Sequence, residues 1–338
     1  MSKKPDDSVC VFGAIALQRY LDALRQEIEG VRTGEDIECV HNMRVASRRI
    51  RSALELFEGC LPARRFAVWE ETIHAITRAL GAARDADVQL AVVSDFAKQH
   101  SGVREKPGLH RVLLRLRQNR AKLQEKLLKT LDRLESDRVL DSLSDRLVNT
   151  LAKQDQTYLF SPDLYQLGYD QISHFLADFL AYEPYVSQPD KLEELHAMRI
   201  AAKRLRYCLE IFASLYPGEL KDQLQACRKI QDQLGDLHDC DVWISFLPQF
   251  LVDERSRILA FFGNLNGYYA LIPGVECFLE DRRLMRESSY QDFVRTWEKQ
   301  QDQQTWQKLS AQIQIPFFRG EPPEEETPST SSQEPLNG

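Results

Sequence analysis

The sequence predicts an all-α protein built from two antiparallel four-helix bundles, which are related by a pseudo-twofold axis and arose by internal duplication. Apolar residues recur every three or four positions along most of the 338-residue chain, and no stretch alternates for long enough to form a strand. Two phrases also occur twice, in the same order. HNMRVASRRIRSALELF from His41 returns as HAMRIAAKRLRYCLEIF from His196, and LGAARDADV from Leu80 returns as LGDLHDCDV from Leu234. The offsets are 155 and 154 residues, so two elements were duplicated together with their spacing.

The first half, residues 1–155, is expected to contain four long helices. Apolar residues with helical spacing run through residues 12–31, 37–57, 66–96 and 109–151. Turn-forming residues rich in Gly, Pro, Ser and Thr separate these stretches.

The second half, residues 156–316, is expected to repeat this scheme. Ser161 and Pro162 indicate the start of its first helix. The expected helices are 164–182, 192–215 and 220–250, followed by a less regular remainder that ends near residue 313.

Two segments near the C-terminus need a separate interpretation. Residues 258–279 are largely apolar, but Asn264, Asn266 and Pro273 interrupt them, which favours a buried pair of helices with a turn over a membrane span. Residues 317–338 are rich in Pro, Glu and Ser and have no hydrophobic face, so they are expected to form a disordered acidic tail.

Charge and cysteine usage set the broad class of the protein. The net charge is −7, but the stretch after Arg319 holds five Glu and no Lys or Arg, so the folded part is nearly neutral and a polyanionic partner is not excluded. Seven cysteines without a CxxC pair favour a reducing cytoplasm, with neither a disulfide framework nor a thiolate zinc site. The N-terminus lacks the apolar run of a signal peptide.

The longer repeated phrase predicts one stripe of positive charge on each of two helices. Both copies hold His, Arg, Arg or Lys, and Arg at relative positions 0, 3, 7 and 10. At about 100° per residue these positions fall within an arc of about 80°, and the apolar residues lie on the opposite side. Each helix can therefore bury one face and offer the other to an anion.

The acidic residues around the stripes have two interpretations. Glu55 and Glu210 follow Arg51 and Arg206 by four residues, which predicts an ion pair that orients each guanidinium. The shorter phrase places Asp85 and Asp87, and likewise Asp239 and Asp241, two residues apart. Residues two apart on a helix point about 200° away from each other, so one Asp of each pair is expected to anchor an Arg of the basic helix. The alternative is a metal-ligand pair, because His238-Asp239 spells the dipeptide of metal-dependent phosphohydrolases.

The two phrases together, HxMR(V/I)AxxRxRxxLExF and LGxxxDxDV, resemble the CHAD family, the conserved histidine α-helical domain. Both halves carry the resemblance, which implies two four-helix bundles with a basic central groove or pore that binds inorganic polyphosphate. Carried onto this sequence, it implies the following polyphosphate-binding residues: His41, Arg44, Arg48, Arg49, Arg51, His196, Arg199, Lys203, Arg204 and Arg206. Arg49 and Arg204 lie about 80° from His41 and its counterpart and are expected to be rim contacts.

The expected function is a non-catalytic module that binds or localises polyphosphate through two facing rows of cations. No catalytic residue, metal ligand or cofactor is expected, and no membrane. A cytoplasmic location is expected, with polyphosphate granules as one place of residence. Nucleic acid is disfavoured as a partner, because Tyr207 alone flanks the stripes and its counterpart is Ser52. The alternative is a metal-dependent phosphohydrolase that acts on polyphosphate or related phosphate compounds through the Asp pairs.

Overall fold

The computed structural model describes residues 6–34, 36–100, 102–154 and 160–319, and it contains helices and no strand in this part of the chain. The all-α class is therefore confirmed. The internal duplication stays a prediction. The expected boundary near residue 155 and most of the acidic tail lie outside the described residues. None of the described helices is long and apolar enough to cross a membrane.

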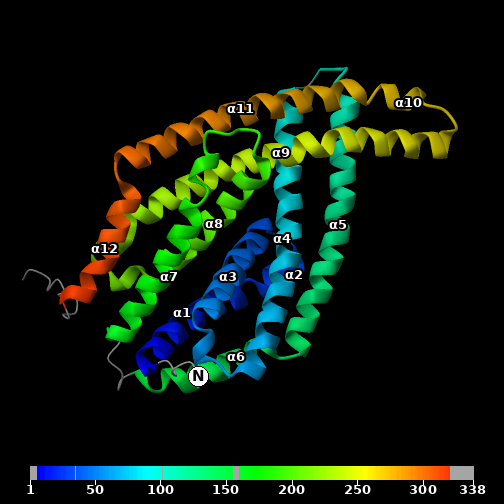
Figure 1. The fold of residues 1–338 in the computed structure, drawn as a ribbon. Coiled ribbons are helices and arrows are strands. Elements are labelled where there is room, and N and C mark those ends of the chain that lie inside the picture. Colours follow the sequence, from blue (N-terminus) through cyan, green and yellow to red (C-terminus); the bar gives the residue numbers. More distant parts are fainter. Residues whose placement is uncertain (1–5, 35, 101, 155–159, 320–338) are drawn as a thin grey trace, which may run out of the picture.

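The first half consists of long helices with two short additions (Figure 1). Its elements are α1 (Asp7–Gln26), α2 (Ile28–Thr33), α3 (Ile37–Leu56), η1 (Glu58–Cys60), α4 (Ala63–Gln99), α5 (Lys106–Ser136) and α6 (Val139–Leu151). The single helix expected over 109–151 is wrong. The chain turns at Arg138, whose φ of 51° ends the helical path and separates α5 from α6.

The second half is more regular than the sequence predicted. Its main helices are α7 (Pro162–Leu180), α8 (Leu192–Phe212), α9 (Lys221–Phe262), α10 (Asn266–Tyr269), α11 (Ile272–Asp302) and α12 (Thr305–Arg319). Short 3-10 turns join some of them. Ser161 caps α7 by accepting from Leu164 N, and Pro162 is its first residue, as predicted. The irregular remainder expected after residue 250 is wrong, because α9 continues through Pro248 and α11 is 31 residues long.

One hydrophobic core runs through both halves. It includes the buried faces of α1, α3 and α4 in the first half and those of α7, α8 and α12 in the second. Phe12 of α1 stacks on Phe212 of α8 with ring centroids 6.0 Å apart, and Phe57 lies 5.9 Å from the same ring. The C-terminal ends of α3 and α8 are therefore fixed against each other by aromatic packing.

A second contact between the halves lies where α5 meets α11, and it depends on two glycines. A Cβ on Gly108 would lie 2.2 Å from the Leu271 carbonyl oxygen, and one on Gly274 would lie 2.0 Å from the Glu105 carbonyl oxygen. The backbones thus approach in a way that only glycine permits. Figure 1 shows the result, in which α9 and α11 run across the ends of α4 and α5. A separate apolar cluster fills this junction.

Residues 258–279 form the buried pair that the sequence suggested only in part: Ile258, Val275 and Phe278 are buried, whereas the tip at residues 261–269 is open to solvent. Phe261 is 82% exposed, and Phe262 and Tyr269 also lie open to solvent. The tip projects beyond α5 in Figure 1, away from the other helices that the structure describes. The turn is present, at Gly263 with φ of 68°.

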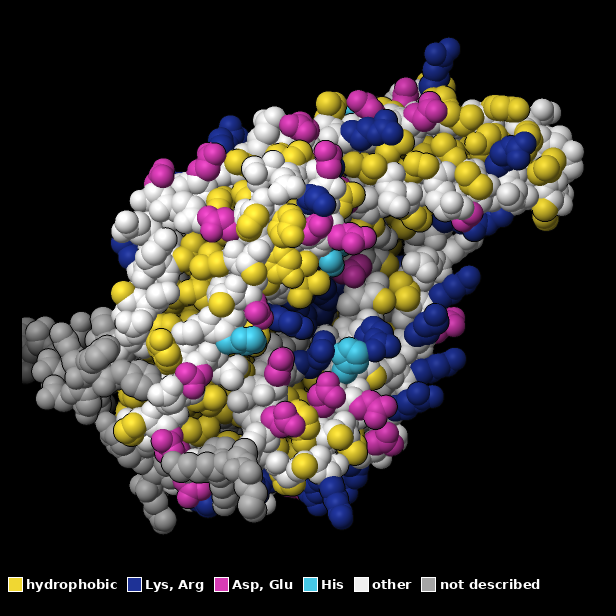
Figure 2. Space-filling model, viewed as in Figure 1, with side chains coloured by type: hydrophobic (Ala, Val, Ile, Leu, Met, Phe, Trp, Pro, Cys, Tyr) yellow, Lys and Arg dark blue, Asp and Glu magenta, His cyan; other side chains and the backbone are white. Residues whose placement is uncertain are grey.

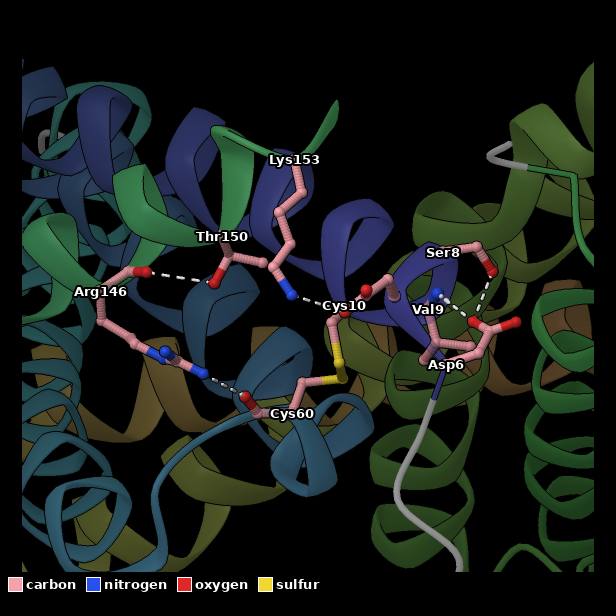
Figure 3. Close-up of a disulfide and its surroundings, with 9 residues drawn as sticks. Asp6, Ser8, Val9, Cys10, Cys60, Arg146, Thr150 and Lys153 are labelled. Carbon is pink, nitrogen blue, oxygen red and sulfur yellow. Dashed lines mark hydrogen bonds and ion pairs between the residues drawn. A yellow bond between two sulfur atoms is a disulfide. The ribbon is translucent and has the colours of Figure 1, made fainter. Parts of the chain in front are cut away.

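Two cysteines form a disulfide, which corrects the expectation that the cysteines stay unpaired. Cys10 of α1 and Cys60 of η1 are bonded, with Cα atoms 5.2 Å apart (Figure 3). The guanidinium of Arg146 donates to the Cys60 carbonyl oxygen beside it. Fifty residues separate the two cysteines, so their spacing gives no sign of the pairing, which depends on how α1 packs along α3.

Candidate functional site

The two basic phrases form α3 and α8, and both helices bury one face in the shared core. Asp36 caps α3 by accepting from Glu38 N, and α8 carries Glu193 and Glu194 in its first turn, where the helix dipole favours negative charge. Met43 and Met198, at the same position of the two phrases, are fully buried. The stripes are therefore turned away from the core.

The stripes meet where Arg48 of α3 approaches α8. The Arg48 guanidinium lies over the ring of Tyr207, 5.3 Å from the centroid, and Arg206 lies over the same ring at 4.8 Å. Tyr207 is buried, and its ring attracts one cation from each half. None of the described carboxylates forms an ion pair with Arg48 or Lys203.

Figure 2 shows a hollow near the centre of this face, filled with Lys and Arg side chains and bordered by His and carboxylate side chains. We call it the central basic hollow. The side chains that define it are those whose charges act on one another across the two halves: Arg44, Arg48, Arg199, Lys203 and Arg206. Three belong to α8 and two to α3.

Burial and mutual repulsion weaken the positive charge of this hollow. Burial, together with the neighbouring charges of Arg48 and Arg199, lowers the pKa of Lys203 to about 7. Burial likewise lowers the pKa of Arg48 to about 10, opposed by Tyr207 and reinforced by Arg44. Burial and mutual repulsion disfavour the charged forms of these groups. An anion that enters the hollow would stabilise those charged forms.

The two arginines that follow the histidines lie against glycine. A Cβ placed on Gly81 of α4 would be 3.6 Å from Arg44 Nε, and one on Gly235 of α9 would be 3.6 Å from Arg199 Nε. Gly81 and Gly235 are corresponding residues of the shorter repeated phrase. The shorter phrase therefore supplies a glycine in each half, and an arginine of the longer phrase packs against it.

Each of the two histidines interacts with a basic residue on another helix of its own half. Burial lowers the pKa of His41, and the charge of Arg84 on α4 lowers it further. His196 packs on His238 of α9 with ring centroids 4.1 Å apart, and burial together with His238 lowers its pKa. Arg84 and His238 occupy the same position of the shorter phrase, so a second basic side chain acts on each histidine.

The Asp pairs diverge, as residues two apart on a helix do. Asp85 turns towards the hollow, where its Oδ1 lies 3.6 Å from Arg44 Nη2. Asp87 points the other way and accepts from Arg120 Nε of α5 at 2.6 Å. In the second half, Asp241 accepts from Arg286 of α11 in the same way.

Asp239 is the counterpart of Asp85 but forms no ion pair with any described residue. Burial raises its pKa; the charge of Arg199 opposes this shift, and the charge of Asp85 adds to it. No group of three or more His, Cys, Asp or Glu side chains in the described residues is arranged to hold a metal ion.

Three of the predicted rim and stripe cations lie outside the hollow. Arg49 forms an ion pair with Glu210 of α8 at 3.0 Å and also lies over Tyr20. Arg204 lines a different cavity of about 310 Å³ beside α7. The charge of Arg51 adds to the effect of burial in lowering the pKa of His74 on α4. Arg51 forms no ion pair with Glu55 or with another described carboxylate.

Glu210 does more than the predicted local pair. It accepts from Arg206 Nη1 at 2.9 Å within α8 and from Arg49 Nε at 3.1 Å across the halves. Arg206 also donates to Gln231 of α9. One carboxylate therefore fixes both the orientation of Arg206 and the distance between α3 and α8.

Several contributing residues were not assigned to the site from the sequence. Tyr207 was noted only as a flanking aromatic, and Arg84, His238 and the two glycines were not assigned at all. For Arg84, His238 and the two glycines, the available sign was their position in the shorter phrase, since that phrase repeats with nearly the same offset as the basic one.

Comparison with known proteins identifies the family. A model of the CHAD domain matches residues 15–248, so the chain belongs to the CHAD family. The structure is similar to the crystal structure of the CHAD domain from the plant Ricinus communis, with a TM-score of 0.63 and 24% identity over 88% of this chain and 93% of that chain. It is also similar to PptA from Streptomyces chartreusis, with a TM-score of 0.56 and 15% identity over 88% of this chain and 100% of that chain. A search of curated proteins finds no match. At these identities the structural likeness shows the fold alone.

Proposed function

We propose that the central basic hollow binds inorganic polyphosphate and that the protein is a binding module. The observation that carries this proposal is that Arg48 and Lys203, two partly buried cations from different halves, lie close enough for the charge of Arg48 to act on Lys203, and neither forms an ion pair with a described carboxylate. A linear polyanion supplies several phosphoryl groups in series, so it can neutralise cations on both helices at once. Membership of the CHAD family, which is known for polyphosphate binding, supports the same ligand.

The side chains in the hollow suit phosphate. Arginine presents a planar fork of donors that can hold two phosphate oxygens, whereas Lys203 supplies a point charge at the position that corresponds to Arg48. Arg44 and Arg199 rest on glycine and need little reorganisation to contact a ligand. Binding through these groups breaks no bond.

The arrangement of the Asp pairs supports a non-catalytic role. Asp87 and Asp241 are engaged by Arg120 and Arg286, so each pair offers the hollow only its other carboxylate. Those two, Asp85 of α4 and Asp239 of α9, act on each other's charge, but among the described residues they belong to no group of three or more side chains that could hold a metal ion. Their positions near Arg44 and Arg199 suit orientation of the cations.

The test is direct binding of long-chain polyphosphate to the wild type and to Arg48→Gln/Lys203→Gln. Charge-assisted hydrogen bonds contribute about 1.5 to 3 kcal/mol each, so the double variant should bind at least about 100-fold more weakly. Lys229→Gln/Lys308→Gln removes the same charge from exposed positions elsewhere and should bind like the wild type. Equal affinity of all three proteins would refute the proposed site.

A second assay addresses catalysis. Phosphate release from polyphosphate should stay at background with Mg²⁺ or Mn²⁺ present. Metal-dependent release that disappears in Asp85→Ala or Asp239→Ala would instead establish the phosphohydrolase.

A further inference from the structure

A second row of cations lies on α5, outside the central basic hollow. The helix carries nine Lys and Arg against three Asp and Glu, in a chain whose net charge is −7. Six of the cations fall within an arc of about 60° at 100° per residue, and with a rise of 1.5 Å they span about 33 Å. We call this row the α5 basic stripe, and its members are Arg111, Arg115, Lys122, Lys126, Lys129 and Arg133.

The stripe is separate from the buried face of α5 and from the acidic residues of the helix. The buried leucines, such as Leu116 and Leu131, lie on another side, and Glu125 and Asp132 fall outside the arc. Figure 2 shows Lys and Arg side chains in a row along the edge where α5 runs, on the same face as the hollow.

The upper end of the stripe is anchored by a buried carboxylate that leaves positive charge in excess. Glu254 of α9 is fully buried and accepts from Arg115 at 2.6 Å, from Arg257 at 2.7 Å and from Arg111 at 3.0 Å. One carboxylate therefore serves three guanidiniums. Arg111 and Arg115 remain about 30% exposed and can still contact an anion.

The lower end is open. Lys122, Lys126, Lys129 and Arg133 are exposed, and none of them forms an ion pair with a carboxylate in the described ranges. Like charges four residues apart, such as Lys122 and Lys126, destabilise a helix by about 0.2 to 0.5 kcal/mol per pair. A face that only keeps the helix solvated would alternate its charges. This one does not.

We infer that the α5 basic stripe is a second binding surface for the same linear polyphosphate, used by chains long enough to extend beyond the central basic hollow. The inference rests on the proposed function. A row of cations about 33 Å long matches a linear polyanion and exceeds what a short oligophosphate could contact. Single-stranded nucleic acid is disfavoured because α5 contains no Phe, Tyr or Trp on which bases could stack.

The experiment compares Lys122→Gln/Lys126→Gln/Lys129→Gln with a matched control, Lys229→Gln/Lys299→Gln/Lys308→Gln. The control also removes three exposed lysines, but from α9, α11 and α12. Long-chain polyphosphate and tripolyphosphate are titrated at several salt concentrations. The stripe variant should bind the long chain about 10-fold more weakly, and the slope of log affinity against log salt should fall by about 2, since each phosphate contact contributes about 0.7 to 0.9. Tripolyphosphate binding and both affinities of the control should stay unchanged.

The possible outcomes separate the two proposals. Unchanged long-chain affinity in the stripe variant, or an equal loss in the control, would overturn the stripe while leaving the hollow intact. Unchanged binding by Arg48→Gln/Lys203→Gln would instead overturn the hollow. A larger loss for duplex DNA or single-stranded RNA than for polyphosphate would assign the stripe to nucleic acid. Because the substitutions remove like-charge pairs, the stripe variant should melt at or above the wild-type temperature, which rules out misfolding as the cause.

Discussion

At the scale of single residues, Lys203 is the most informative group in the hollow. Its counterpart in the first half is Arg48, which keeps its charge at all physiological pH values. The pKa of Lys203 is lowered to about 7, so near neutral pH it is close to half charged in the free protein. A bound polyanion favours the charged form and raises this pKa.

Binding of polyphosphate should therefore take up a proton at Lys203. As the pH rises above about 7, the free protein loses that proton and must regain it on binding, so affinity should fall by up to about 10-fold per pH unit until the pKa of the complex is reached. Titrations from pH 6.5 to 9.5 test this. Lys203→Arg, which stays charged, should show a flatter profile with the same ligand. Parallel profiles would mean that Lys203 does not titrate on binding.

The histidines contribute in a lower pH range. Burial and adjacent cations lower the pKa of His41, His196 and His238 below the ordinary value of 6.5. They are therefore mainly neutral at pH 7 and gain charge only as the pH falls, so their contribution to anion binding should appear below the range in which Lys203 titrates.

At the scale of secondary-structure elements, the distance between α3 and α8 depends on Glu210. Its side chain is 13% exposed and holds Arg49 of the other half and Arg206 of its own helix. A partly buried carboxylate with two guanidiniums is worth more than a solvated surface pair. The bridge also restrains the helices that carry the hollow.

A double-mutant cycle of Arg49→Gln and Glu210→Gln should show a coupling energy of about 1 kcal/mol or more in the free energy of unfolding. Glu210→Gln alone should cost about 1 to 3 kcal/mol, because it leaves two guanidiniums without their acceptor. Denaturant titrations measure each term. Additivity within about 0.3 kcal/mol would show that the two groups are independent and that the bridge restrains nothing.

At the scale of the whole molecule, the two halves are joined at the shared core, at the α5–α11 crossing and at the N-terminal end of α1, where the Ser8 and Ser161 hydroxyls form a hydrogen bond. The Cys10–Cys60 disulfide lies at this last place and ties α1 to the turn that follows α3. It restrains the C-terminal end of a helix that lines the hollow.

Cys10→Ser should lower the free energy of unfolding by about 2 to 4 kcal/mol, the usual contribution of a disulfide that closes a loop of this kind. Thermal melts with and without a reducing agent check this. The reductant should shift the wild type to the temperature of the variant and leave the variant unchanged. Cys277→Ser is the control, since Cys277 is unpaired in the structure. No response of the wild type to reduction would show that the bond does not form or does not stabilise the fold.

The sequence by itself determined the helical class, the family and the phase of the two basic stripes. These depend on local periodicity, because residues 3, 4 and 7 apart share a helix face whatever the rest of the chain does. The same periodicity also places the cations of the α5 basic stripe on one face of their helix. The internal repeat gives no second sign of this stripe, because α11, which follows α9 and the short α10, does not carry it.

Only the tertiary structure decided which cations share the hollow. Arg49 and Arg51 belong to the same phrase as Arg48. Arg49, however, forms an ion pair with Glu210, and the charge of Arg51 acts on His74. The Cys10–Cys60 bond and the contact of Arg48 with the Tyr207 ring likewise depend on packing between segments far apart in the chain. Periodicity fixes the direction of a side chain relative to its own helix axis. What that side chain meets depends on how the helices cross, which is set by the buried side chains and by small residues such as Gly108 and Gly274.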